Sequence, residues 1–164
     1  DHKTGLGFAD NFPLYGNFKF AIPEGALGAH SPAIAVGMLD IGTRKHVTDY
    51  NVLYAKFAKS ITTKDVSFGK LSMGYFTGNR ELLVDENGQD DNDGLMAAWE
   101  RTMTEISPKL WLCLEYMSSH SAYCTWNFGG AWKFAPNVSL IVGYDSFINN
   151  MLANTVTIQT DIDF

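Results

Sequence analysis

The sequence predicts an all-β protein built from antiparallel strands. Apolar and polar residues alternate in segment after segment, which is the side-chain period of a β-strand. Such segments recur roughly every 15 residues, separated by turn-forming residues, and none of them has a convincing helical period. At 164 residues the chain suits a single domain spanning residues 1–164.

Five strands are expected in the N-terminal part, at residues 15–22, 32–42, 49–59, 70–76 and 94–102. Most of them alternate visibly, but 32–42 is apolar on both faces and its phase cannot be read. In 49–59 the alternation places Tyr50, Val52 and Tyr54 on the apolar face, which Lys56 then interrupts.

Four further strands are expected at residues 109–117, 125–134, 137–145 and 154–164. The last of these is the clearest, because Val156, Ile158 and Ile162 share one face and Thr157 and Asp161 the other. The total is nine strands, with a poor tenth if residues 2–9 contribute one.

The composition restricts the class of protein. The chain is 46% hydrophobic and 18% charged, with mean hydropathy close to zero. No run of about 18 apolar residues exists, so a helical membrane protein is excluded. A net charge of −6 and a pI of about 5.0 argue against a nucleic-acid partner, which needs clustered Lys and Arg.

The alternation alone is compatible with two classes of β protein, which differ in what the apolar face contacts. In a soluble β-barrel or sandwich that face is the core, and the protein could bind an apolar ligand. In a transmembrane barrel it meets lipid, while the polar face lines the interior. Three observations favour the membrane barrel.

The first observation is the polar face, which carries small residues and isolated charges instead of the denser charge of a soluble sheet. The charged residues expected to line a pore are Lys19, Lys59, Lys70, Glu100, Glu115, Lys133, Asp145, Asp161 and Asp163. Acids and bases are nearly balanced, so these residues indicate either ion networks filling a narrow lumen or a channel lining with weak cation preference.

The second observation is that aromatic residues gather toward strand ends on the apolar face, as in the girdles at membrane–water interfaces. The expected girdle residues are Tyr50, Tyr54, Tyr75, Tyr116, Trp126, Trp132, Phe134 and Tyr144.

The third observation is that connection lengths alternate. Counting back from Phe164, the expected periplasmic turns are 135–137, 105–108 and 62–65, with 23–31 as a long exception. The expected outside connections are 146–154, 118–121, 77–93 and 43–48. Short inner turns and longer outer loops are typical of outer-membrane barrels.

Several phrases resemble a family of porin-like bacterial outer-membrane β-barrels whose function is uncharacterised. They are "SPAIAVGMLDIGT" (31–43), "TDYNVLYAKFAK" (48–59), "LLVDENGQDDNDG" (82–94), "RTMTEISPKLWL" (101–112) and "PNVSLIVGYD" (136–145). The resemblance covers roughly residues 13–164 and implies a barrel in the outer membrane of a Gram-negative bacterium, with Phe164 resembling the terminal aromatic read by the assembly machinery. Such proteins have a signal peptide and an even number of strands, so the chain is expected to be the C-terminal portion of a larger barrel.

The acidic loop at 77–93 invites comparison with a calcium-binding loop. From Asp85 the ligand spacing is followed for three positions, but Asp90 stands where the turn needs Gly, and no closing Glu follows in register. A solvated loop is therefore favoured over loose divalent-cation binding. Its acids would still attract cations to the mouth of a barrel; they are Glu81, Asp85, Glu86, Asp90, Asp91 and Asp93.

The two cysteines flank the 118–121 connection but differ in strand parity. Cys113 alternates with the polar set, whereas Cys124 shares the parity of Trp126. Cross-strand partners in a disulfide must point to the same face, so both thiols are expected to be free.

No catalytic or metal-binding set emerges. The segment 118–123 with Glu115 supplies Ser, His and a carboxylate, but His120 is followed directly by Ser121 and lies on a short loop, a poor setting for a held base. The remaining histidines are scattered without ligand spacing.

We therefore expect a non-enzymatic outer-membrane β-barrel without cofactors, acting as a porin-like passive channel or a structural surface protein. Its expected partners are the lipid bilayer and lipopolysaccharide, the outer-membrane assembly machinery, and small solutes or ions. The soluble barrel or sandwich with an apolar ligand is the alternative.

Overall fold

The computed structural model describes residues 14–64 and 66–162. Within them the chain forms one antiparallel sheet in which each strand pairs with the next in sequence order. The strands are β1 (Tyr15–Ile22), β2 (Ala33–Gly42), β3 (Val52–Thr62), β4 (Ser67–Thr77), β5 (Asp93–Thr102), β6 (Leu110–Met117), β7 (Thr125–Ala135), β8 (Val138–Phe147) and β9 (Thr155–Ile162). The expected all-β, up-and-down antiparallel architecture is confirmed.

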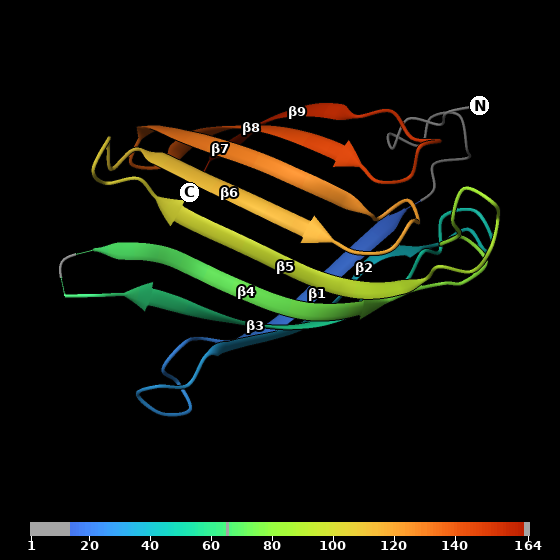
Figure 1. The fold of residues 1–164 in the computed structure, drawn as a ribbon, viewed down its shortest axis with the longest axis horizontal. Helices are drawn as coiled ribbons and strands as arrows, with labels where there is room; N and C mark the ends of the chain where they lie inside the picture. The colour runs from blue at the N-terminus through green and yellow to red at the C-terminus, as the bar shows by residue number, and fades with distance from the viewer. Residues whose placement is uncertain (1–13, 65, 163–164) are drawn as a thin grey trace.

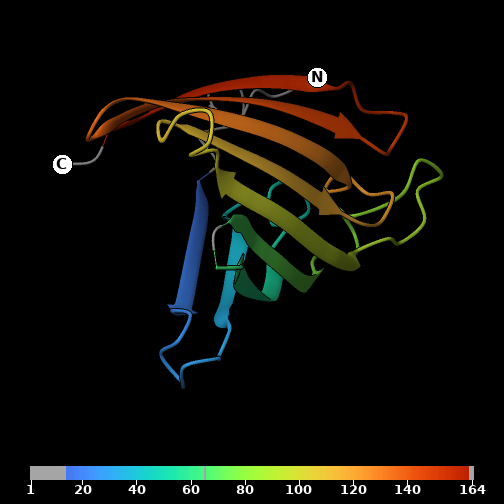
Figure 2. The same cartoon turned by 60° about the vertical axis from the view of Figure 1, so that its left-hand side comes forward.

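The sheet curls strongly along its width but does not close (Figure 1). Figure 2 shows β1 and β2 turned steeply against β8 and β9, so that the sheet forms a trough. Among the described residues, β1 and β9 are not hydrogen-bonded to each other. The described residues contain no helix suited to crossing a membrane.

Connections gather at the two ends of the trough. The end we call the loop end holds residues 43–51, 78–92, 118–124 and 148–154. The opposite end, the turn end, holds 23–32, 63–64, 66, 103–109 and 136–137. This is the grouping that the sequence predicts, including the long exception between β1 and β2.

The register assigns each side chain to a face, because residues paired directly across an antiparallel ladder share one. Tyr75 pairs with Leu95, and Trp99 with Leu114, so the apolar sets of β4, β5 and β6 lie on one face, called here the outer face. Phe128 pairs with both Leu114 and Tyr144. The predicted phase from β4 to β9 is therefore correct.

The predicted phase of β3 is wrong. Ala55 pairs with Tyr75 and Phe57 with Met73, so it is the odd-numbered residues of β3 that share the outer face. Tyr54 consequently lies on the other side, here called the inner face, where it is buried. Tyr50, which precedes β3, packs on the same inner cluster.

Glycine permits a close approach on the inner face of β2. Gly37 stands directly opposite Tyr54 in the ladder. A Cβ atom at Gly37 would lie 2.6 Å from the Tyr54 hydroxyl oxygen, which leaves no room for any side chain. The hydroxyl end of Tyr54 therefore lies against the β2 backbone at Gly37.

The buried core is small and sits on the inner face near the loop end. Val52, Phe76 and Leu83 are fully buried and pack with Tyr54. Leu83 comes from the 78–92 loop, so this loop folds back over the sheet. Partly buried side chains surround the cluster: Leu39, Tyr50, Met96, Met117 and Tyr123.

Candidate functional site: the outer face, the inner face and the loop-end cap

The outer face exposes large apolar side chains from every described strand except β6, whose apolar side chains are only partly exposed. On the edge strands Phe20 is 66% exposed and Ile158 71%, and the central strands show the same pattern. Further members are Phe18, Ile34, Val36, Leu53, Phe57, Leu71, Met73, Tyr75, Leu95, Trp126, Phe128, Trp132, Val142, Tyr144 and Val156. A soluble monomer rarely exposes an apolar patch beyond a few hundred Å², so this face is built to be covered.

Aromatic side chains on the outer face form two bands. Tyr75, Tyr116, Trp126 and Tyr144 occupy the strand ends nearest the loop end, and the rings of Tyr116 and Trp126 pack at a tilt of 36° with centroids 4.5 Å apart.

Trp132 and Phe134 lie toward the turn end, where the Trp99 indole also donates to the Phe68 carbonyl over 2.7 Å. Of the expected girdle residues, only Tyr50 and Tyr54 fall on the inner side.

The inner face carries most of the charged strand residues, whereas Asp93 and Arg101 share the outer face. By the register the inner face holds Lys19, Lys70, Glu100, Glu115, Lys133, Asp145 and Asp161, as the alternation predicts. Lys59 is a correction: it pairs with Leu71 and so lies on the outer face, where it reaches Glu24 of the turn end over 3.0 Å. Lys56 takes its place on the inner face. Asp163 and Phe164 lie outside the described residues.

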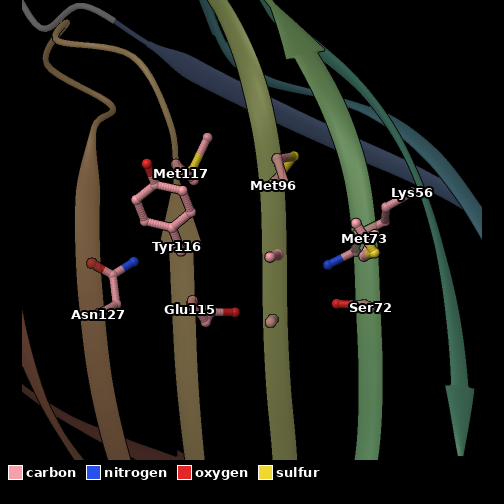
Figure 3. A pocket seen from close by; sticks show the side chains of 10 residues that line it. Lys56, Ser72, Met73, Met96, Glu115, Tyr116, Met117 and Asn127 are labelled. Atoms are coloured by element: carbon pink, nitrogen blue, oxygen red, sulfur yellow. The ribbon is translucent and has the colours of Figure 1, made fainter.

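A row of small and polar side chains crosses the inner face at mid-height. Through successive pairs, Ser72 stands opposite Ala98, Ala98 opposite Glu115, Glu115 opposite Asn127, and Asn127 opposite Asp145. Figure 3 shows Ser72 and Glu115 pointing toward one another across β5, with the Lys56 side chain extending from β3 toward the same strip.

The side chains around this row enclose a cavity of only about 50 Å³, lined also by Met96 and Met117. One polar atom in it has no partner: the buried Asn127 Oδ1 receives no hydrogen bond. Glu115 forms no ion pair with any described residue, whereas Lys70 and Glu100 neutralise each other at 3.2 Å. The cavity is too small for an apolar ligand of drug size, which needs several hundred Å³.

The loop-end cap, defined as residues 43–51, 78–92, 118–124 and 148–154, lies at one end of the trough. Hydrogen bonds connect each of its loops to another. The Asn79 backbone N–H donates to the Tyr50 carbonyl (2.8 Å), the His120 N–H donates to the Asp91 carboxylate, and the Asn149 amide donates to the His120 carbonyl (2.7 Å).

The cap also bridges the trough, because Tyr123 donates to Asp40 of β2. Burial, reinforced by this hydrogen bond, raises the pKa of Tyr123 far above its ordinary value. Its ring also packs on Tyr50, with centroids 5.9 Å apart.

Acidic residues of the 77–93 loop form ion pairs and hydrogen bonds with neighbouring side chains. Arg80 pairs with Asp90 at 3.0 Å, His46 pairs with Glu81, and Tyr75 donates to Asp93.

Asp85 accepts the backbone N–H groups of Gln89 and Asn87, both at 2.8 Å. These hydrogen bonds, from Gln89 first, lower the pKa of Asp85. Among the described residues, no group of three or more His, Cys, Asp or Glu is arranged to hold a metal ion.

Both cysteines are free, as their parity predicts. Cys113 is half-buried on the inner face, opposite Gly129. Cys124 is fully buried in the cap, where its thiol lies 2.9 Å from the Ser119 hydroxyl and burial raises its pKa. Sequence reasoning missed the buried Cys124 and Ser121, which Ser119 contacts, because loop residues carry no period that reveals burial.

Comparison of the chain with protein-family models, with curated proteins and with solved structures gave no match.

Proposed function

We propose that the chain forms the wall of a transmembrane β-barrel in a bacterial outer membrane, with its outer face against lipid. One observation carries this proposal: exposed apolar side chains lie on one face of every described strand except β6, where they are partly exposed, while most of the charged strand residues lie on the opposite face. Water does not tolerate such a face, whereas an antiparallel sheet whose faces alternate in this way is suited to a barrel in lipid. The two aromatic bands, one toward each end of the strands, support this proposal because rings favour the headgroup layers.

The interior supports a passive role. Under this proposal the inner face is wetted and its mixed charges line a narrow path for small ions or solutes, with the loop-end cap facing the outside of the cell. The buried cluster around Leu83 occupies the inner face near the loop end, with side chains of β2 to β6 packed in or against it. A hollow of about 450 Å³ at the turn end is larger than the cavity of about 50 Å³ beside Glu115. It is lined by Trp111, Lys133 and Asp161 among others.

A soluble carrier of an apolar ligand is less well supported. Such a carrier places its apolar side chains inside, around a ligand-sized cavity. Here the apolar side chains are outside, and the grooves among them, near Ile34 and Met73 for example, are open surface depressions.

The test is electrophoresis of the protein from isolated outer membranes in SDS, with and without boiling. A closed barrel resists SDS until it is heated, so the mobility is expected to change on boiling. Recovery in the soluble fraction with unchanged mobility would overturn the proposal. Conductance recordings of the purified protein in planar bilayers then distinguish a channel from a structural protein. A channel gives conductance steps and a structural protein gives none.

A further inference from the structure

The sheet has two free edges, formed by β1 and β9. Within residues 14–64 and 66–162 neither outer edge is paired with another strand. Their outward backbone N–H and C=O groups have no partner in the sheet. In lipid no water replaces the missing hydrogen bonds, so the unpaired polar groups of an open edge strongly destabilise it.

Strand direction decides what can fill this gap. All eight junctions of the sheet are antiparallel, so directions alternate and β1 and β9 run the same way. A direct β9–β1 junction would therefore be parallel. A second copy inserted in the same orientation also offers β1 to β9, and again the junction would be parallel.

We propose that the free edges bind an odd number of further membrane-spanning strands that are not supplied by a second copy of this chain. This inference rests on the proposed function, because it is lipid that makes the open edges untenable. An odd number restores antiparallel pairing at both edges and gives an even total, the rule for bacterial single-chain barrels.

The edges specify the chemistry of these strands. Phe20 on β1 and Ile158 on β9 face outward, so the residues facing them across each new junction are apolar. The inner positions require polar partners. Lys19 has no ion pair within the described residues, and Asp161 contacts only the Gln159 amide, at 2.5 Å. An acid opposite Lys19 and a base opposite Asp161 complete the pattern.

The experiment places a benzophenone amino acid at Ala21 of β1, or at Thr155 or Asp161 of β9, and irradiates the protein in its native outer membrane. The adducts are mapped by mass spectrometry. Ser72 of β4 is the matched control, since both of its neighbours belong to this sheet. The control is expected to give adducts only with β3 and β5.

At the edges, we expect adducts with a peptide of alternating apolar and polar residues. The Thr155 and Asp161 probes should map in reverse order along that peptide, because the new junction is antiparallel. An adduct between β1 and β9, within one chain or between copies, overturns the inference while leaving the barrel intact. Edge probes without any adduct, beside a working Ser72 control, also overturn it. Protein absent from the membrane overturns the proposed function instead.

Discussion

The phenol of Tyr123 donates a hydrogen bond to the carboxylate of Asp40, although 83 residues separate them. Tyr123 belongs to the connection between β6 and β7, whereas Asp40 lies near the end of β2. The contact joins the two flanks of the trough at the loop end. Asp40 has a left-handed backbone, with φ of 47°, a conformation that Asp adopts more readily than most residues. The curl of the sheet is therefore fastened by a specific polar contact.

Replacing Tyr123 with Phe tests this fastening. The variant keeps the ring on Tyr50 but removes the donor to Asp40, so we expect a loss of about 1–3 kcal/mol in the free energy of unfolding. Urea titration of the protein in detergent micelles, followed by tryptophan fluorescence, measures the loss. An unchanged unfolding midpoint would show that the contact contributes nothing.

The same residue predicts a dependence on alkaline pH. The pKa of Tyr123 is raised by burial and by Asp40, so the folded state keeps the phenol protonated when the unfolded chain ionises. Stability from this group is complete below about pH 10, the ordinary value, and falls as pH rises further. Unfolding free energies measured from pH 9 to 11 should fall more steeply for the wild type than for Tyr123→Phe. Equal slopes would contradict the assignment.

Leu83 also holds the cap to the sheet, through apolar packing. Its side chain is fully buried against Val52 and Phe76. Leu83→Ala removes this packing and leaves a cavity, for which we expect a loss of about 2–5 kcal/mol. Met151→Ala is the control, because Met151 is 77% exposed in a neighbouring part of the cap, and its effect should be within about 0.5 kcal/mol. Similar urea midpoints for the two variants would show that Leu83 is not buried.

The strands and most of their phases could be predicted from sequence because a half-exposed strand carries its period locally. The phase that the sequence predicts for β3 is wrong for a physical reason. The predicted alternation rests on Tyr50 and Tyr54, which are apolar enough to suit an outer face but pack in the inner cluster with Leu83. Lys56, on the inner face in the structure, marked the correct phase within the same segment.

The cap could not be predicted, because its contacts join residues far apart in the chain. Nothing near Asp91 indicates that its carboxylate accepts the backbone N–H of His120. The acidic loop therefore looked like a solvated charge cluster from sequence, whereas the structure uses its carboxylates to hold neighbouring loops together. The phase of β2, apolar on both faces, needed its ladder with β3 before it could be assigned.

Glu24 predicts a local transition in acid. Its carboxylate accepts hydrogen bonds from the Ser60 hydroxyl (2.8 Å) and N–H (3.0 Å) and pairs with Lys59. The Ser60 hydroxyl contributes most, and together these contacts lower the pKa of Glu24 from 4.5 to about 2.

Stability from a lowered carboxyl pKa is present above the unfolded value and is lost as pH falls from about 4.5 toward 2. The Ser60 amide resonance in NMR should therefore titrate with a midpoint near 2 and stay flat in Glu24→Gln. A midpoint near 4.5 would contradict the contact.

Substitutions at two adjacent residues of β9 can show whether lipid or water covers the outer face. Ile158 is on that face, and Thr157 is on the inner one. In a bilayer, Ile158→Arg places a charge in hydrocarbon and should cost about 2–4 kcal/mol if the position lies near the midplane, whereas Thr157→Arg should be nearly neutral.

In a soluble protein the order would differ, because Ile158 is already exposed and an arginine there would be tolerated. Folding into lipid vesicles, followed by the mobility shift on boiling, measures both variants against the wild type. Equal yields for the two would mean that lipid does not cover this face.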